Sequence, residues 1–338
     1  MKKASSPHTL FAPFAPFVVN QNAPPSLALR ISVTDRCQLR CRYCMPPEGI
    51  ACGCHNDILS YEEITQLVRL LQKNHGIHKI RLTGGEPLVR PQIEKLVAML
   101  AELGIPDIAL TTNALKLAPM AAPLKAAGLK RINISLDALS PETFGSITGS
   151  QNVQAVLEGI AAAKAAGLTP IKLNTVAIKD ENDHELIPIV HYALANGLEA
   201  RFIERMPIGP GVEAYQDGFL SSANVQKILE NAFLLTPATN EPGSSARRFQ
   251  VTDQAGRKGT IGLISSCSNP FCSGCRRLRI TACGELIGCL AREDGIPSRP
   301  LLQQGNDAAI LDAVQTAMGG KRANTLFEQA RSMSRIGG

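Results

Sequence analysis

The chain has 338 residues, of which 44% are hydrophobic and 19% are charged, and its formal net charge is +6. This length and hydrophobic content allow one large domain or two smaller ones. No segment approaches the ~18 consecutive apolar residues of a membrane-spanning helix, which excludes a protein built around such helices. The small positive charge leaves a solvated basic surface and an anionic substrate equally open.

The N-terminus predicts an irregular arm over residues 1–25. Its basic start resembles that of a signal peptide, but Pro13 and Pro16 interrupt the apolar segment that should follow. We therefore expect a cytoplasmic protein that binds no membrane. Ten cysteines in a cytoplasmic chain indicate metal or redox chemistry rather than structural disulfides.

Residues 26–210 alternate between short strand-like segments and helical segments. The predicted strands are 29–34, 79–84, 108–113, 131–137, 171–178 and 200–206. The predicted helices, with apolar spacings of three and four, are 61–73, 91–103, 119–127, 153–166 and 184–196. Four of them precede a glycine, as helix C-termini often do: Gly104, Gly128, Gly167 and Gly197. The alternation predicts a parallel α/β sheet, curved into a barrel or doubly wound.

A second, smaller region is predicted over residues 211–338, because the alternation stops near Gly209. Its segment RRFQVTDQAGRKGTIGLIS (247–265) predicts a β-hairpin. In the first region, candidate ligand contacts follow the strands at their C-terminal ends: Thr83, Thr111, Ser135, Asn174 and Met206. Barrel enzymes place their active sites at that end.

Three cysteines, Cys37, Cys41 and Cys44, follow the first predicted strand in the pattern Cx3Cx2C. Three thiolates suit a four-iron cluster with one iron left open for a ligand. A zinc knuckle or unpaired loop thiols are the alternatives. The motif, with Tyr43 inside it and GGEP (84–87) after the second strand, resembles that of the radical S-adenosylmethionine (SAM) superfamily. The resemblance implies that the amino and carboxylate groups of SAM bind the open iron.

A second trio, Cys272, Cys275 and Cys289, follows the pattern Cx2Cx13C. On spacing alone, a zinc site closed by Cys267 or Cys283 is a competing interpretation. The surrounding sequence, together with LRISVTDRCQLRCRYCMPPEGI, KIRLTGGEPLVRP, GLKRINISLDAL, RFIERMP and the terminal SRIGG, closely resembles the GTP 3′,8-cyclase family of molybdenum cofactor biosynthesis. The likeness covers nearly the whole chain.

This resemblance implies an incomplete (β/α)6 TIM-type barrel of the radical SAM type, with a smaller C-terminal α+β region that holds a second [4Fe-4S] cluster. It implies two sets of cluster ligands, namely Cys37, Cys41 and Cys44, and Cys272, Cys275 and Cys289. It implies SAM contacts at Tyr43, Gly84, Gly85, Glu86, Ser135, Asn174 and Met206. It implies GTP contacts at Arg30, Lys79, Arg81, Thr111, Lys172, Arg277, Leu278 and Arg279. Catalytic roles are implied for Arg277, Arg279, Gly337 and Gly338, the last two threading into the site.

The implied reaction begins when a 5′-deoxyadenosyl radical from SAM removes the hydrogen at C3′ of GTP. The C3′ radical then attacks C8, and reduction gives (8S)-3′,8-cyclo-7,8-dihydroguanosine 5′-triphosphate. The implied partners are GTP, an electron donor of flavodoxin or ferredoxin type and a downstream cyclic pyranopterin monophosphate synthase. No nucleic-acid partner is expected, and the protein is expected to be a monomer or homodimer. The basic residues agree with a triphosphate, because guanidinium groups bind phosphate bidentately.

Three alternatives stay open at this point. They are another two-cluster radical SAM enzyme such as a peptide modifier, a non-catalytic electron carrier, and a zinc-binding interaction module. The chain also departs from the family pattern at Arg276 and Cys283. Four further cysteines, Cys52, Cys54, Cys267 and Cys283, are interpreted as thiols that ligate neither cluster.

Overall fold

The computed structural model describes residues 26–46, 48–49, 57–209, 215–240, 244–321, 327, 331 and 333–336. The predicted N-terminal arm, Cys52, Cys54, Gly337 and Gly338 lie outside these residues. Within the described part, no helix is long and apolar enough to cross a membrane.

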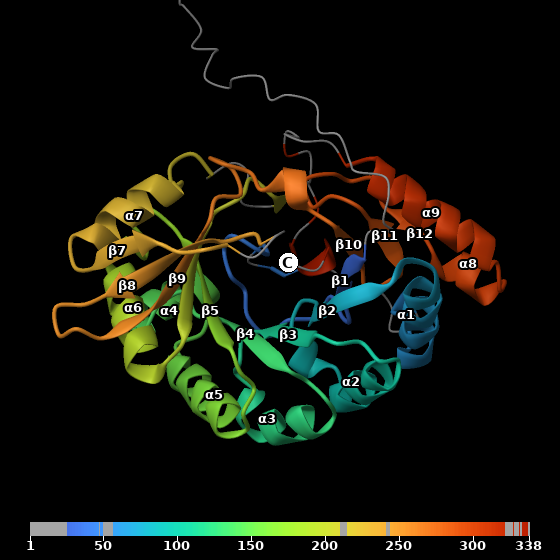
Figure 1. The fold of residues 1–338 in the computed structure, drawn as a ribbon, viewed down its shortest axis with the longest axis horizontal. Coiled ribbons are helices and arrows are strands. Elements are labelled where there is room, and N and C mark those ends of the chain that lie inside the picture. The colour runs from blue at the N-terminus through green and yellow to red at the C-terminus, as the bar shows by residue number, and fades with distance from the viewer. Residues whose placement is uncertain are drawn as a thin grey trace, which may run out of the picture.

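Six parallel strands form the wall of an open barrel, and neighbouring strands follow one another in chain order. They are β1 (Leu27–Ser32), β2 (Ile77–Thr83), β3 (Ile108–Thr112), β4 (Arg131–Ser135), β5 (Ile171–Ala177) and β6 (Glu199–Glu204). The helices of this region include α1 (Tyr61–His75), α2 (Ile93–Glu102), α3 (Leu117–Ala126), α4 (Pro141–Thr148), α5 (Val153–Ala165) and α6 (Leu186–Asn196). Short 3-10 turns are η2 (Pro87–Val89) and η3 (Asp183–Glu185). Figure 1 shows the strands curving around a centre with helices outside them.

The C-terminal strands extend this sheet at both edges. On the β6 edge lie β9 (Lys258–Ile264), β8 (Arg247–Thr252) and β7 (Leu234–Pro237); on the β1 edge lie β10 (Arg277–Ile280), β11 (Glu285–Ile287) and β12 (Ile296–Pro297). The remaining elements are α7 (Ser222–Glu230), η5 (Cys272–Gly274), α8 (Arg299–Gln303), α9 (Asp307–Gly319) and α10 (Met333–Ile336). The described strands therefore form one sheet, although the sequence predicts two regions.

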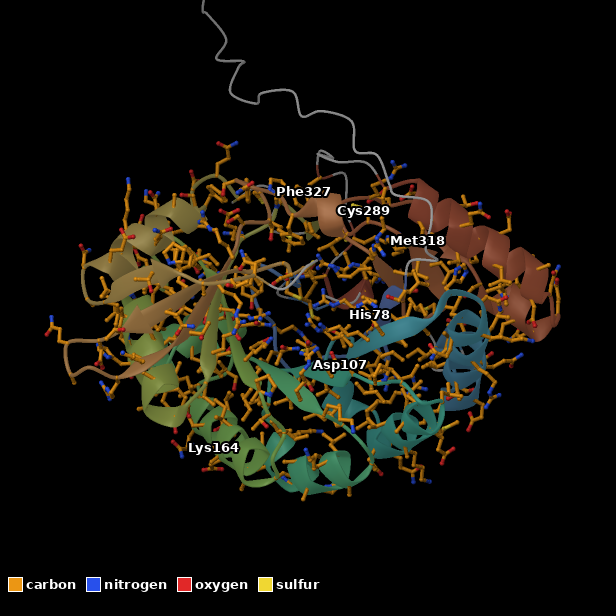
Figure 2. All side chains as sticks on the ribbon, in the orientation of Figure 1. His78, Asp107, Lys164, Cys289, Met318 and Phe327 are labelled. Atoms are coloured by element: carbon orange, nitrogen blue, oxygen red, sulfur yellow. The ribbon has the colours of Figure 1, made fainter. Side chains whose placement is uncertain are left out.

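Local sequence signals explain where the first helix begins and which face it buries. Ser60 caps α1 by accepting from Glu63 N, and the Glu63 carboxylate accepts from Ser60 N, so both free amides are satisfied. Ile64, Leu67 and Leu71 recur at helical spacing and are fully buried against the sheet. The apolar layer between helices and strands is thus fixed by periodicity. In Figure 2, Lys164 lies on the outer, helical side of the ring and Asp107 on the inner, strand side.

The predicted α/β barrel, its six strands and its five helices are confirmed, with ends shifted by a few residues. The predicted hairpin is also confirmed, since β8 and β9 pair antiparallel. The four predicted C-terminal glycines have positive φ values of 69–106°. The sequence analysis did not predict α4, which Ser140 caps at its N-terminus.

Candidate active site

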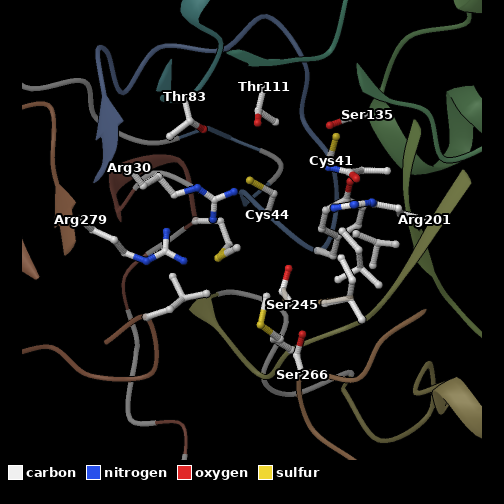
Figure 3. A pocket seen from close by; sticks show the side chains of 18 of the residues that line it. Arg30, Cys41, Cys44, Thr83, Thr111, Ser135, Arg201, Ser245, Ser266 and Arg279 are labelled. Carbon is white, nitrogen blue, oxygen red and sulfur yellow. The ribbon is translucent and has the colours of Figure 1, made fainter. Parts of the chain in front are cut away.

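A cavity of about 890 Å³ occupies the centre of the barrel, and both cysteine trios line it. Figure 3 shows Cys41 and Cys44 on one side of the cavity, with Arg30 and Arg279 together on another. The polar side chains of Thr83, Thr111 and Ser135 also face it. The two predicted iron–sulfur sites therefore open into one space.

The N-terminal thiols lie on the loop that follows β1. Cys44 N and Met45 N both donate to the Cys41 carbonyl, at 2.8 and 3.0 Å, so the last two cysteines share one tight turn. The thiol of Cys37 lies 3.8 Å from Asn113 Nδ2. Burial raises the pKa of each thiol, to about 12 for Cys44. These thiols are thus held in an environment that disfavours charge until a cation or cluster binds.

The glycines of GGEP pack against this loop. Gly85 N donates to the Thr34 carbonyl and Glu86 N to the Arg36 carbonyl, each at 2.7 Å. A Cβ atom at Gly84 would lie 2.5 Å from the Thr34 carbonyl oxygen, and one at Gly85 would lie even closer to that of Arg36. The structure thus explains why both positions are glycine, because a side chain at either one would displace the thiol loop.

Two buried carboxylates stand beside the N-terminal thiols. Glu86 accepts hydrogen bonds of 2.6–2.9 Å from Leu88 N, Thr112 Oγ1 and Asn113 N. Burial nevertheless raises the pKa of Glu86 to about 7. Asp137 accepts from Tyr43 Oη at 2.7 Å, and burial raises its pKa to about 6. This end of the cavity therefore carries groups that favour a cationic ligand.

The C-terminal thiols have the opposite surroundings. They lie on and beside η5 and after β11, at Cys272, Cys275 and Cys289. Lys321 Nζ lies 3.7 Å from Cys275 Sγ and donates to the Cys275 carbonyl at 3.1 Å. Burial opposes ionisation of Cys275, but Arg277 and Lys321 lower its pKa to about 7. Positive charge therefore favours a thiolate at this end.

A row of arginines crosses three neighbouring strands. Arg30 on β1 is in register with Arg279 on β10 and with Arg81 on β2. Register partners in parallel strands point to the same face, and all three side chains line the cavity. Burial and the neighbouring arginines lower their pKa values, to about 9 for Arg81 and about 10 for Arg279. Like charges placed opposite one another destabilise a sheet, so this row favours an anion in the cavity.

Most predicted site residues line the cavity. They are Arg30, Cys37, Cys41, Tyr43, Cys44, Arg81, Gly84, Gly85, Glu86, Thr111, Ser135, Asn174, Met206, Cys272, Cys275, Arg277, Arg279 and Cys289. Arg277 and Arg279 lie on one face of β10, as an extended segment requires. Arg30 and Arg81 lie within their strands rather than at the strand ends, and both side chains face the barrel interior.

Three predicted GTP contacts are not among the residues that line the cavity. The side chain of Leu278 is fully buried in the core, because it alternates with Arg277 and Arg279 along β10. Lys79 Nζ lies 3.8 Å from Asp107, and Lys172 Nζ lies 3.9 Å from Glu199. Both lysines lie nearer the N-terminal than the C-terminal ends of their strands.

Two charged residues that line the cavity, Arg201 and Asp137, were not among the predicted site residues. Arg201 reaches in from β6, on the opposite side from Arg30 and Arg279 (Figure 3). A signal existed for Asp137, which follows the polar end of β4 by two residues. Residues 199–204 give no such signal for Arg201. A strand that is buried on both faces lacks the polar and apolar alternation that would show which side chains face the cavity.

The donor sets fit the groups that the motifs imply. Each trio consists of thiols that face the cavity, and each leaves room beside it for a further ligand. Among the residues that the structure describes, no three His, Cys, Asp or Glu side chains are grouped so that they could hold a single metal ion.

Comparison with known families agrees with this geometry. Residues 31–193 match the radical SAM superfamily, and residues 198–327 match the family described as Molybdenum Cofactor Synthesis C. A GTP 3′,8-cyclase of Moorella thermoacetica is 43% identical over 320 residues, covering 92% of this chain and 97% of that protein. The chain belongs to the GTP 3′,8-cyclase family. Family members from Clostridium botulinum and Rhodopirellula baltica are 41% and 40% identical, over 91% and 92% of this chain and 94% and 89% of theirs.

Solved structures share the fold of this family at low identity. Streptococcus suis SuiB bound to S-adenosylmethionine is 16% identical, with a TM-score of 0.60 over 89% of this chain and 68% of that one. SuiB bound to its precursor peptide SuiA gives a TM-score of 0.62 at 16% identity, over 89% of this chain and 67% of that one. The predicted radical SAM fold is thus confirmed, and family membership brings with it a [4Fe-4S] cluster and SAM.

Proposed function

We propose that the chain converts GTP to (8S)-3′,8-cyclo-7,8-dihydroguanosine 5′-triphosphate, the first step of molybdenum cofactor biosynthesis. The proposal includes two [4Fe-4S] clusters, one on each cysteine trio, with SAM at the N-terminal cluster and GTP at the C-terminal one. Its partners are a flavodoxin- or ferredoxin-type electron donor and a cyclic pyranopterin monophosphate synthase. The localisation is proposed to be cytoplasmic, and the assembly a monomer or homodimer.

The observation that carries this proposal is the arginine row beside the C-terminal thiols. Arg30 Nε and Arg81 Nε are buried and have no hydrogen-bond partner among the described residues. A buried charge without a partner is costly, so such a cluster needs a polyanion. A nucleoside triphosphate carries three or four negative charges and can accept several bidentate guanidinium contacts. A peptide substrate supplies no such density of charge, which disfavours the peptide-modifier alternative.

When bound, the N-terminal cluster and SAM supply the radical that removes the hydrogen at C3′. The chain's own residues orient the reactants. Glu86 and Asp137 suit the ammonium and sulfonium charges of SAM, and Tyr43 is held against Asp137 by its 2.7 Å hydrogen bond. Arg30, Arg81 and Arg279 hold the anionic substrate, and the buried cavity wall keeps water from the radical.

Further contacts of this proposal come from the edges of the cavity. Ser135, Asn174 and Met206 would border SAM, and Thr111 the ribose. Lys79, Lys172 and Arg201 would complete the phosphate site. Gly337 and Gly338 are proposed to enter the site as the chain's C-terminal residues, and they lie outside the described part of the chain.

The experiment that tests the proposal uses anaerobically purified protein with reconstituted clusters. SAM and a strong reductant are added with and without GTP, and 5′-deoxyadenosine and nucleotides are followed by mass spectrometry. We expect deoxyadenosine that depends on GTP, together with a product of the mass of GTP but a different retention time. Deoxyadenosine without that product would overturn GTP as the substrate.

A further inference from the structure

A buried carboxylate on β6 lies among three cations. One oxygen of Glu199 accepts from Arg201 Nε at 2.6 Å, and the other lies 3.4 Å from Arg248 Nη2 and 3.9 Å from Lys172 Nζ. The Glu199 side chain is only 9% exposed. The group carries two more positive than negative charges. This excess of positive charge, most of it in largely buried side chains, would attract an anion bound nearby.

Arg201 is fixed from two sides. Glu199 holds its Nε edge, and the stem of the side chain crosses Gly262 on β9, its register partner. A Cβ atom at Gly262 would lie 3.3 Å from Arg201 Cγ and 3.1 Å from Ala246 Cβ. The glycine therefore leaves the space that the stem occupies. With Nε engaged, the two terminal nitrogens of Arg201 stay available to the cavity that it lines.

We propose that Glu199 is a positioning residue for triphosphate recognition, which holds Arg201 in the orientation that binds the phosphates of the nucleotide. The inference rests on the proposed GTP function. An arginine whose orientation is already fixed by a carboxylate loses less side-chain conformational entropy when it binds phosphate. The free energy of binding is therefore more favourable than for a mobile arginine.

An alternative role for Glu199 is purely electrostatic. A carboxylate near a phosphate site competes with the phosphate for the same cations, and its removal should then tighten nucleotide binding. The positioning role predicts the opposite sign. The two roles can therefore be separated by the direction of the change in affinity.

The test compares Glu199→Ala, Glu199→Gln and Gly262→Ala in the protein with both clusters reconstituted. Binding of GTP, GDP and guanosine is measured by calorimetry, and KM and kcat for GTP are measured with SAM and reductant. Asp253→Ala is the matched control, because Asp253 is similarly buried and accepts from Arg257 Nε at 2.6 Å, but Arg257, unlike Arg201, does not line the cavity. Iron content and thermal melting are measured for each variant.

We expect Glu199→Ala to bind GTP about tenfold more weakly, with guanosine affinity and kcat at saturating GTP unchanged. Glu199→Gln keeps an oxygen that can accept from Arg201 Nε and should lose less. Gly262→Ala should weaken GTP binding without removing any charge, which keeps the proposal testable if a Glu199 variant does not fold. Asp253→Ala should bind all three ligands as the wild type does.

Tighter or unchanged GTP binding in Glu199→Ala would overturn the positioning role, and so would a Gln variant as weak as the Ala variant. Wild-type protein that binds GTP no better than guanosine would overturn the proposed function itself. Wild-type protein that discriminates between them, alongside variants that do so equally well, would overturn only the role of Glu199.

Discussion

The two ends of the central cavity present three thiols each, but their electrostatic surroundings are opposite. The N-terminal trio lies beside Glu86 and Asp137, and burial raises the pKa of each of its thiols. The C-terminal trio lies beside Arg277 and Lys321, which lower the pKa of Cys275 to about 7 against the effect of burial. SAM carries cationic groups and GTP carries a polyanion. The contrast therefore supports the proposed placement of SAM at the N-terminal end and of GTP at the C-terminal end, which the count of cysteines alone does not.

The largest expected effect comes from removing one thiol at either end. Cys44→Ser should abolish SAM cleavage, because the cluster that binds SAM loses one of three protein ligands. Cys289→Ser should abolish the cyclised product but leave SAM cleavage at the N-terminal end. The measurement is 5′-deoxyadenosine and nucleotide product from reconstituted protein. Normal deoxyadenosine from Cys44→Ser would break the assignment of the N-terminal end, and a fully active Cys289→Ser that of the C-terminal end.

A second pair of substitutions tests the two ends through backbone packing. A Cβ atom at Gly85 would press on the Arg36 carbonyl beside the N-terminal trio, and one at Gly288 would press on the Ala317 carbonyl beside Cys289. Backbone atoms cannot rotate away, so each neighbour must shift. We expect Gly85→Ala to lose the N-terminal cluster and Gly288→Ala the C-terminal cluster, each leaving about half of the iron.

Iron analysis and electron paramagnetic resonance check this prediction, with Gly305→Ala as the control. A Cβ atom at Gly305 would meet nothing within 4 Å, although its φ of 67° adds backbone strain. Full iron content in both Gly85→Ala and Gly288→Ala would show that the two cysteine trios tolerate displacement of the backbone that supports them.

The arginine row can be tested by replacing one of its members. Arg81→Met keeps much of the side-chain volume and removes one of three adjacent like charges. We expect GTP affinity to fall about tenfold or more, while the melting temperature stays constant or rises because repulsion is relieved. Arg276→Met is the control, since Arg276 directly precedes β10 but is exposed and does not line the cavity. Reduced stability together with unchanged GTP affinity would mean that the row is structural.

The sequence predicted the parts of the fold that depend on local patterns. The alternation of strands and helices, the glycines that end helices and both cysteine motifs are written in short segments, and the structure bears out the elements. The pairing of β10 with β1 and of β9 with β6 was not predicted, because periodicity indicates that a strand forms but not which strand it joins. The site shows the same division. Arg30 and Arg81 were found through the family likeness. Arg201 and Glu199 were not found, because the groups that surround this pair, Lys172, Arg248 and Gly262, come from other strands.

The smallest expected effect is a difference in thiol reactivity, which can be measured without changing the sequence. It reports directly how the two ends of the cavity differ in thiol ionisation. In protein stripped of iron by a chelator under reducing conditions, iodoacetamide reacts with thiolates, so each cysteine reacts according to its ionised fraction. The lowered pKa of Cys275, at about 7, gives a large thiolate fraction at pH 7 to 8, and this fraction falls as the pH drops below 7. The raised pKa of Cys44, at about 12, leaves that thiol protonated until far higher pH.

Mass spectrometry after brief labelling from pH 6 to pH 10 should therefore show Cys275 modified first. Cys283 is the reference, because it is exposed and its own pKa is raised. Labelling of Cys44 at the same pH as Cys275 would contradict the proposed electrostatic difference between the two ends. The proposed placement of GTP would then rest on the arginine row alone.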